Sequence, residues 1–414
     1  MSNLRKMFII GLVWPEPNSS AAGVRMLQLI KHFKTRFSIQ FLCAASKSDY
    51  SIPLDEIGVP MIEIQLNDSS FDNFISSEKP DFVLYDRYIS EEQFSWRVRE
   101  AYPLTIHILD TEDLHFLREA RSILLESKST SDMLHYDNQI THRELASIYR
   151  SDISLIISRF EMNLLETTFA VDKKLIFFLP MLSDDTNSTY TINSFEEREG
   201  FMFIGNFLHA PNWDAVLYLK NEIWPRLSLL CSTASLHIYG AYASQKVFQL
   251  NQPRERFFVH GRAEDLTDTY NKHRVMLAPL RFGAGVKGKL LDAMNHQLPS
   301  VTTTIGAESL GNSDNWNGSI SDSPIDFCEK ASELYITKND WSRAVEKGKK
   351  LYKEIQQEYT NQWNQLDIEL ENRVQNLAAY RSTNFIGNML NYHLVKSTTY
   401  FSKWIEEKNK GKKE

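Results

Sequence analysis

Two glycines and two basic residues lie close together in one segment and could bind a phosphate. Residues Pro279–Met294 read PLRFGAGVKGKLLDAM, and Gly283 and Gly285 stand just before an expected helix. Glycines let a backbone approach a ligand closely, and a helix N-terminus presents N–H groups and partial positive charge that suit a phosphate. Arg281 and Lys287 add full positive charge beside the glycines. The segment therefore predicts a site for a nucleotide diphosphate.

This segment resembles the donor-binding signature of glycosyltransferase family 4, whose members are retaining enzymes of the GT-B fold. Many members read P-L-R-x-G-A-G-x-K-x-K-x-x-E-A-M, with Asp292 here in the place of the Glu. Members often carry a second glutamate eight positions earlier, where this chain has Ala284. The resemblance implies that Asp292 contacts the ribose of the donor; the alternative is a solvated helix residue. It also implies that the donor site includes Gly283, Gly285, Val286 and Lys287.

A second segment, Phe203–Ala215 (FIGNFLHAPNWDA), resembles the motif that opens the C-terminal domain in the same family. Its Gly205 would let the loop pass close to the donor phosphates. Gly205 and Asn206 are either ligand contacts or turn residues. Many relatives of this fold place an Arg and a Lys just after this strand, whereas His209 is the one candidate cation here. Neutralisation of the donor's negative charge is therefore assigned to Arg281 and Lys287.

Two further loops match the family more loosely. Arg262 lies in His260–Leu266 (HGRAEDL), a loop that lies beside the nucleotide base in the family. Arg262 either contacts the base or ribose or belongs to a turn and helix cap. Trp14–Arg25 follows the first expected strand, and the resemblance places this loop near the donor phosphate and the acceptor. Its Gly23 suits close ligand approach, and Arg25 is either a ligand contact or a surface charge.

The segment Leu109–Arg118 (LDTEDLHFLR) is assigned to the acceptor side. It resembles the D-x-x-D-x-H-x-x-R stretch of bacterial relatives and ends an expected strand. Ligands of open α/β sheets bind at the carboxyl ends of the strands. Asp113 and His115 could therefore orient acceptor hydroxyls or act on protons, and the alternative for His115 is a structural histidine. Asp86 and Arg87 also end a strand, with weaker support.

Short apolar runs recur along the chain and alternate with helical patterns, such as Gly23–Phe33 and Arg118–Tyr149. Continuous apolar runs bounded by turns are typical of buried parallel strands, and their alternation with helices indicates open α/β sheets. The runs that we expect to be strands are Met7–Val13, Ser38–Cys43, Met61–Gln65, Phe82–Tyr85, Leu104–Leu109, Ile153–Ile157, Lys174–Leu179, Phe201–Gly205, Ser235–Tyr239, Phe257–Val259, Val275–Ala278 and Ser300–Thr303.

The sequence thus predicts the α/β GT-B plan, with two Rossmann-like doubly wound domains and C-terminal helices that cross back. The expected N-terminal, acceptor-side domain covers residues 1–182, and a linker rich in Ser, Thr, Asn and acid covers 183–200. The nucleotide-sugar-binding domain covers 201–375. Residues 376–414 form the crossing helices and a charged tail. Helical patterns are expected over Asp326–Trp363 and Asp367–Lys408.

Composition narrows the class of protein. The 414 residues carry a formal net charge of −7, so no global basic field attracts nucleic acid. The three cysteines lie far apart without metal-ligand spacing, which fits a reducing compartment. No apolar stretch is long enough to span a membrane. We expect a cytoplasmic protein with a solvated tail at Lys403–Glu414; contact of the tail lysines with the inner face of an anionic membrane is the alternative.

These features predict a retaining, hexosyltransferase-type glycosyltransferase that moves a sugar from a nucleotide-diphosphate sugar to an acceptor hydroxyl. Polysaccharide or glycoconjugate biosynthesis is the expected context, with a glycan, lipid-linked or protein acceptor. No D-x-D triplet is placed to hold a metal, so neither a metal nor a cofactor is expected. Two alternatives stay open, a non-catalytic glycosyltransferase-like subunit and a GT-B-fold nucleotide-sugar epimerase.

Overall fold

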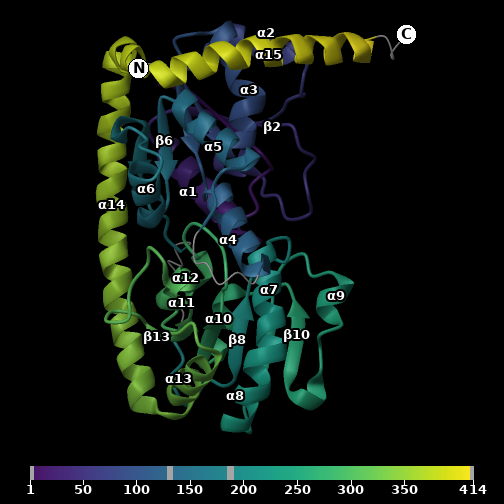
Figure 1. Ribbon diagram of the computed structural model, residues 1–414, viewed down its shortest axis with the longest axis vertical. Coiled ribbons are helices and arrows are strands. Elements are labelled where there is room, and N and C mark those ends of the chain that lie inside the picture. The colour runs from purple at the N-terminus through teal and green to yellow at the C-terminus, as the bar shows by residue number, and fades with distance from the viewer. Residues whose placement is uncertain (1–3, 128–133, 184–190, 411–414) are drawn as a thin grey trace.

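The computed structural model describes residues 4–127, 134–183 and 191–410, and their strands form two parallel sheets, one in each half of the chain (Figure 1). The first sheet has the order β3-β2-β1-β4-β5-β6-β7 and the second β10-β9-β8-β11-β12-β13. In both, the chain starts near the middle and reverses direction, as in doubly wound folds. The predicted α/β class is confirmed. Of the predicted linker, residues 184–190 lie outside the described residues.

The strands lie where the buried apolar runs predicted them, with one addition. β13 reads Gly-Ser-Ile and has no apolar run, so its sequence carries no strand signal. A Cβ on Gly318 would lie 2.1 Å from the carbonyl oxygen of Ser300, so this edge strand needs its glycine. The strands are β1 Lys6–Gly11, β2 Ser38–Cys43, β3 Met61–Glu63, β4 Phe82–Asp86, β5 Ile106–Asp110, β6 Ile153–Ile156, β7 Ile176–Phe178, β8 Phe201–Ile204, β9 Leu236–Tyr239, β10 Phe257–Gly261, β11 Val275–Ala278, β12 Ser300–Thr302 and β13 Gly318–Ile320.

Helices cover both faces of each sheet, because successive residues of a buried strand point to opposite sides. In β1, Met7 and Ile9 join one apolar cluster, and Phe8 and Ile10 join the cluster on the other face. The helices before the C-terminal pair are α1 Ala21–Phe33, α2 Ser69–Glu78, α3 Arg87–Ala101, α4 His115–Ser127, α5 Gln139–Arg150, α6 Arg159–Thr167, α7 Ala210–Tyr218, α8 Trp224–Leu230, α9 Gln245–Phe248, α10 Leu266–Lys272, α11 Gly288–Asn295, α12 Thr304–Ala307 and α13 Pro324–Ile336.

The helical pattern expected over Arg118–Tyr149 forms two helices, α4 and α5, instead of one. Asn138 caps α5, because its side chain accepts a hydrogen bond from the backbone N–H of Thr141 at 3.0 Å. Residues 128–133 lie outside the described residues.

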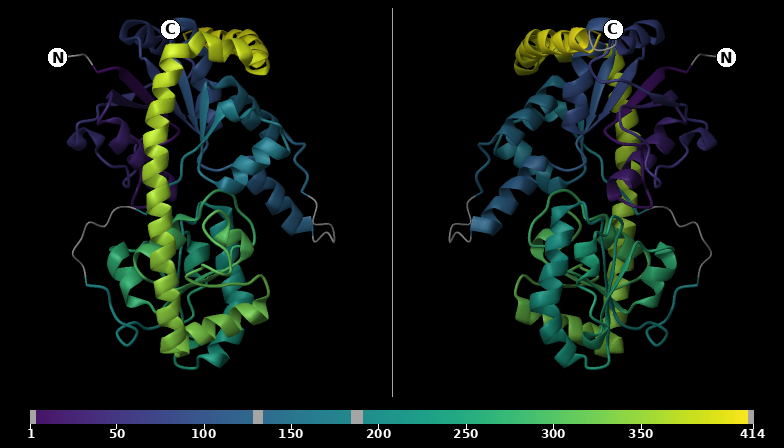
Figure 2. Two further views of the ribbon diagram at one scale, coloured as in Figure 1. Left: turned by 90° about the vertical axis from the view of Figure 1, so that its left-hand side faces the viewer. Right: turned by 90° about the vertical axis from the view of Figure 1, so that its right-hand side faces the viewer.

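A long helix, α14 (Lys338–Thr383), which is kinked at Asn376, runs along both halves of the molecule (Figures 1 and 2). Trp363, Leu366 and Leu370 belong to the apolar core of the N-terminal half, and Asp367 pairs with a histidine of α1. The break expected between Trp363 and Asp367 is therefore absent, and the helix that crosses back begins well before residue 376. It is followed by α15 (Phe385–Lys410). Among the described residues, no helix is long and apolar enough to span a membrane.

Candidate functional site

A cavity of about 580 Å³ lies between the two halves of the chain, at the carboxyl ends of the central strands. Its walls are built by the loops after β1, β5, β8 and β11 and by the first turn of α11. Doubly wound folds bind ligands at this edge of the sheet, and the volume suits a drug-sized ligand. The cavity is lined by ten of the thirteen predicted site residues, Asp113, His115, Gly205, Asn206, Arg262, Gly283, Gly285, Val286, Lys287 and Asp292.

The glycine loop before α11 is fixed by the other half of the chain. The backbone N–H of Gly285 donates to Glu161 Oε1 at 2.8 Å, and Arg121 Nη1 donates to the carbonyl oxygen of Gly283 at 2.7 Å. Gly285 has a φ of +63°, and a Cβ there would lie 2.8 Å from Asp113 Cβ, so only glycine fits. Because Glu161 accepts from the Gly285 N–H, this amide is not available to an anion, whereas the start of α11 presents further N–H groups to the cavity.

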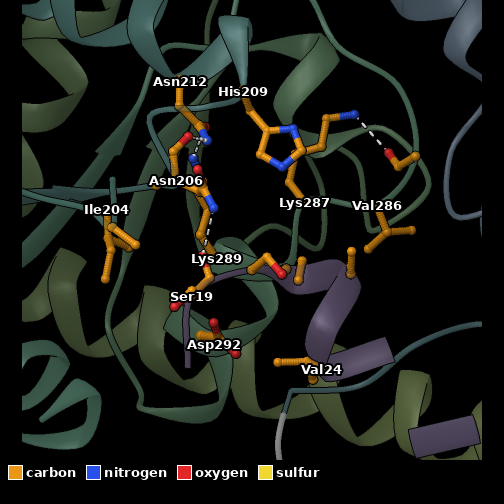
Figure 3. Close-up of a pocket in the computed structure, with 18 of the residues that line it drawn as sticks. Ser19, Val24, Ile204, Asn206, His209, Asn212, Val286, Lys287, Lys289 and Asp292 are labelled. Atoms are coloured by element: carbon orange, nitrogen blue, oxygen red, sulfur yellow. Dashed lines mark hydrogen bonds between the residues drawn. The ribbon is translucent and has the colours of Figure 1, made fainter. Parts of the chain in front are cut away.

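Lys289, in that first turn, is a cation of the cavity that the sequence analysis missed. Its Nζ donates to Asn212 Oδ1 at 2.5 Å, and Asn212 Nδ2 donates to the carbonyl oxygen of Asn206 at 2.8 Å (Figure 3). Burial lowers the pKa of Lys289 to about 7, and the charge of Lys287 adds to the shift. The spacing of the two lysines, on either side of the start of a helix, was a usable signal for Lys289.

Lys287 and His209 lie together on another side of the cavity (Figure 3). Lys287 Nζ donates to the carbonyl oxygen of Gly285 at 2.8 Å. Burial lowers the pKa of Lys287, although the nearby carboxylate of Glu308 partly opposes the shift. Burial and the charge of Arg118 lower the pKa of His209 to about 4. His209 is therefore neutral at pH 7, and the lysines supply the positive charge of this wall.

The structure does not bring Arg281 into the cavity, contrary to the assignment from sequence. Its guanidinium pairs with the carboxylate of Asp214, with Nε donating to Oδ2 at 3.0 Å, and lies over the ring of Tyr218. Both partners belong to α7, on the outer side of the loop. Arg281 therefore anchors α7 to the glycine loop, and Lys289 of α11 lines the cavity where Arg281 was expected.

Gly23 and Arg25 are likewise outside the cavity. Gly23 lies inside α1, where a Cβ would come within 2.4 Å of the carbonyl oxygen of Glu16, so this glycine allows close packing of the preceding loop. The side chain of Arg25 is fully buried and pairs with Asp110 Oδ1 at 3.0 Å. The loop assigned to the ligand does line the cavity, through Pro17–Ala22.

The remaining donor-side residues line the cavity as expected. Asn206 Nδ2 donates to the carbonyl oxygen of Ser19 at 3.1 Å, so this side chain also joins the two halves. Arg262 lies over the ring of Tyr50, 5.0 Å from its centroid. Asp292 projects from α11 toward the cavity and accepts a weak hydrogen bond from the Tyr270 hydroxyl at 3.4 Å (Figure 3). The N-terminal half therefore supports these residues through the backbone of Ser19 and the side chain of Tyr50.

His115 and Asp113 line the cavity at the start of α4, where Asp113 lies next to the glycine loop. His115 Nδ1 lies 3.0 Å from Glu144 Oε1, and both oxygens of Glu144 accept backbone N–H groups of α4. Burial alone would lower the pKa of His115, but the hydrogen bond to Glu144 and the charge of Asp113 raise it above its usual value. Since Nδ1 is engaged, Nε2 is the nitrogen that can reach a ligand.

Asp113 stays ionised in this wall. Burial would raise its pKa, but the charges of Arg118, with which it pairs, and of His115 hold the pKa below its usual value. An ionised carboxylate can only accept hydrogen bonds, so Asp113 suits a sugar or acceptor hydroxyl. It cannot serve as a proton donor near pH 7.

Glu112 is a second residue that the sequence analysis did not assign. It lines the cavity, and its backbone has a φ of +63°, which is rare outside glycine and is often a sign of a functional constraint. Its buried Oε1 has no hydrogen-bond partner among the described residues. Burial, with the neighbouring charge of Asp110, raises the pKa of Glu112 well above its usual value. The cavity wall thus holds a carboxyl that favours the protonated form beside an ionised one.

Part of the chain matches a known sequence family. Residues 198–336 match the family model described as "Glycosyl transferases group 1". This stretch runs from the start of the second sheet through α13 and contains the glycine loop and α11. No curated protein matches the chain in sequence.

Solved structures match nearly the whole chain. Sucrose-phosphate synthase from Thermosynechococcus elongatus has a TM-score of 0.59 at 11% identity, covering 91% of this chain and 100% of that chain. Anabaena HepE in complex with UDP has a TM-score of 0.60 at 10% identity, with 86% and 100% covered. WaaG, a glycosyltransferase involved in lipopolysaccharide biosynthesis, has 0.59 at 12%, with 84% and 95% covered. The chain therefore has the GT-B fold, and the family model within its second half supports a GT-B glycosyltransferase.

Proposed function

We propose that this chain transfers a sugar from a nucleotide-diphosphate sugar to an acceptor hydroxyl with retention of the anomeric configuration. One observation carries the proposal: Lys287, Lys289 and the first turn of α11 line the same cavity as Asp113 and His115. When the bond from the sugar C1 to the diphosphate oxygen breaks, negative charge develops on that oxygen. Preorganised cations and helix N–H groups in a buried cavity stabilise such charge.

Asp113 and His115 act on the acceptor. As the new bond from C1 to the acceptor oxygen forms on the face that the diphosphate leaves, the hydroxyl proton passes to the departing diphosphate oxygen, so the hydroxyl must be held on that face. Asp113 accepts a hydrogen bond from a hydroxyl, and His115 reaches a reacting oxygen through Nε2 because Nδ1 is held by Glu144. Both residues are fixed by neighbours of the same half, which keeps their orientation independent of the donor.

The remaining parts of the proposal concern the substrates. The lysines supply charge that a divalent cation supplies in other diphosphate sites, so we propose transfer without a metal or a cofactor. The HepE structure holds UDP, and WaaG takes part in lipopolysaccharide biosynthesis. By this likeness we propose a hexosyl donor, EC class 2.4, a cytoplasmic reaction in surface glycan or glycoconjugate synthesis, and a glycan, lipid-linked or protein acceptor.

A ligand screen followed by a product assay tests the function. A ligand that binds only the native state raises the apparent stability, so thermal unfolding with UDP, GDP, TDP and ADP sugars should identify the donor by an upward shift. Incubation of that donor with candidate acceptors should release the nucleoside diphosphate, and proton NMR should show the donor's anomeric configuration in the product. Binding without turnover would indicate a non-catalytic subunit, and an inverted product would rule out retention.

The low pKa of Lys289 predicts that donor affinity falls as the pH rises. The pKa is lowered from 10.5 to about 7, so the ammonium is mostly charged below pH 7 and mostly neutral above it. A bound diphosphate favours the charged form and raises this pKa; between the free and bound values, binding takes up a proton. Affinity should then fall by up to about tenfold per pH unit above pH 7.

Calorimetry with the nucleotide sugar, whose diphosphate does not titrate in this range, measures that dependence. The matched control is Lys289→Arg, because a guanidinium stays charged throughout and should flatten the profile. Equal slopes for the wild type and Lys289→Arg would assign the pH dependence to another group.

A further inference from the structure

The C-terminal helix α15 lies across the end of the N-terminal half, and one of its faces is fixed there (Figures 1 and 2). A Cβ on Gly387 would lie 2.1 Å from the carbonyl oxygen of Tyr149 in α5, so the two helices touch at this glycine. Ser402 is buried; its Oγ accepts from Arg97 Nη2 at 2.6 Å and donates to Asn67 Oδ1 at 2.9 Å. This face of α15 is therefore part of the fold.

Large apolar side chains are exposed on the rest of α15. Their spacing of three or four residues places most of them along one side of the helix. Tyr400 is 76% exposed, Phe401 62% and Trp404 58%. In the described part of the chain, every exposed Tyr and Trp belongs to α15. We call the following residues the aromatic face: Phe385, Ile386, Met389, Tyr392, Tyr400, Phe401 and Trp404.

Positive charge accompanies the aromatic face. Lys403 and Lys408 are exposed, and Lys408 Nζ lies 5.0 Å from the centroid of the Trp404 ring. The sequence from Lys403 to Glu414 contains five lysines and three glutamates, a formal charge of +2 in a chain whose net charge is −7. The end of the chain thus combines apolar rings with a net positive charge, whereas the rest of the sequence has a formal net charge of −9.

We propose that the aromatic face of α15 binds the surface of an anionic lipid bilayer, with the helix lying in the plane of the surface. Tyr and Trp rings favour the membrane–water interface, where their apolar bodies and polar groups are both accommodated. Lysines beside them reach the headgroups and are attracted by anionic lipid. A second copy of this chain could also cover an apolar face, but the exposed lysines beside the rings favour an anionic surface. The proposal concerns a surface away from the cavity and does not depend on the proposed function.

Co-sedimentation of the full chain with vesicles tests the proposal. The chain should bind vesicles of phosphatidylcholine mixed with phosphatidylglycerol, bind phosphatidylcholine alone more weakly, and be released by salt. The triple variant Tyr400→Ser, Phe401→Ser, Trp404→Ser should lower binding roughly tenfold or more, because the apolar contact is lost. The double variant Lys403→Glu, Lys408→Glu should lower binding to mixed vesicles by roughly tenfold or more and should remove the preference for anionic lipid.

Two exposed leucines of α8 provide the matched control. Leu229 and Leu230 are 82% and 48% exposed at the other end of the molecule, so Leu229→Ser with Leu230→Ser should bind vesicles as the wild type does. Nucleotide affinity and thermal unfolding should be unchanged in every variant, since none of the described side chains of α15 lines the cavity. Wild-type binding by the triple variant, or no vesicle binding by the wild type, would overturn the proposal. A dimer in light scattering that the triple variant dissociates would assign the face to a second copy of the chain.

Discussion

Replacement of Lys289 by alanine should weaken binding of the nucleotide diphosphate by roughly 10- to 100-fold, because one charge-assisted hydrogen bond contributes about 1.5–3 kcal/mol. The side chain is half-buried in the cavity wall and oriented by Asn212, so little else can take its place. Isothermal titration calorimetry with the nucleoside diphosphate measures the change. Thermal unfolding without ligand should show that the fold is intact.

Two further variants define what such a loss means. Lys289→Arg keeps the charge and should retain most of the affinity. Arg281→Ala removes a cation of the same segment that pairs with Asp214 outside the cavity, and it should change the affinity less than about twofold. A large loss in Arg281→Ala, with none in Lys289→Ala, would contradict the placement of these two side chains.

Lys287→Ala should also weaken binding by roughly 10- to 100-fold, but for a less simple reason. Lys287 Nζ donates to the carbonyl oxygen of Gly285, so the variant loses a support of the glycine loop as well as a charge. The two lysines face one ligand, and their effects should therefore not add in the double variant.

The strands were predictable because buried parallel strands are continuous apolar runs. The run Ser38–Cys43 matches β2 residue for residue, and Val275–Ala278 matches β11. Each of these strands is covered by helices on both faces of its sheet, so nearly every position is buried. The sequence therefore shows a continuous apolar run at the same residues. β13 was not predictable, because its pairing depends on the glycine that lets it approach β12 and not on apolar side chains.

The charged residues of the site were less predictable than its glycines. A loop glycine marks a backbone conformation that depends on nearby residues, so the neighbouring sequence is enough to predict it. The role of an arginine cannot be predicted before its ion-pair partner is known. Arg25 is a buried structural residue because it pairs with Asp110, 85 residues away in β5. Asp214, 67 residues before Arg281, directs that side chain away from the cavity.

The contact between Glu161 and Gly285 could not be predicted from the sequence for a related reason. It joins α6 of the N-terminal half to the glycine loop of the C-terminal half, so it exists only once the two halves have met. Burial and the charge of Asp113 raise the pKa of Glu161 to about 8. No periodicity or motif around residue 161 marks a residue that acts across a domain boundary.

Replacement of His115 by alanine should lower turnover by about 100-fold or more, while donor affinity changes little. The imidazole lines the cavity at the start of α4, and the groups that we propose to hold the diphosphate come from α11 in the other half of the chain. Rates of nucleoside diphosphate release at saturating donor, together with calorimetric donor affinity, separate the two effects. The matched control is His142→Ala, because that histidine lies on α5 with its side chain mostly exposed.

Glu144→Gln distinguishes a reacting histidine from a packed one. The carboxylate of Glu144 helps to raise the pKa of His115, so its replacement should lower that pKa and move the limb of the pH–rate profile that His115 controls toward lower pH. The amide oxygen of glutamine can still accept one of the two backbone N–H groups at the start of α4, and thermal unfolding of the variant should show that the fold persists. If the profile of Glu144→Gln coincides with that of the wild type and His115→Ala retains full turnover, His115 only packs against Tyr88 and the wall of the cavity. A shifted profile in Glu144→Gln and a slow His115→Ala enzyme would together place the imidazole at the reacting atoms.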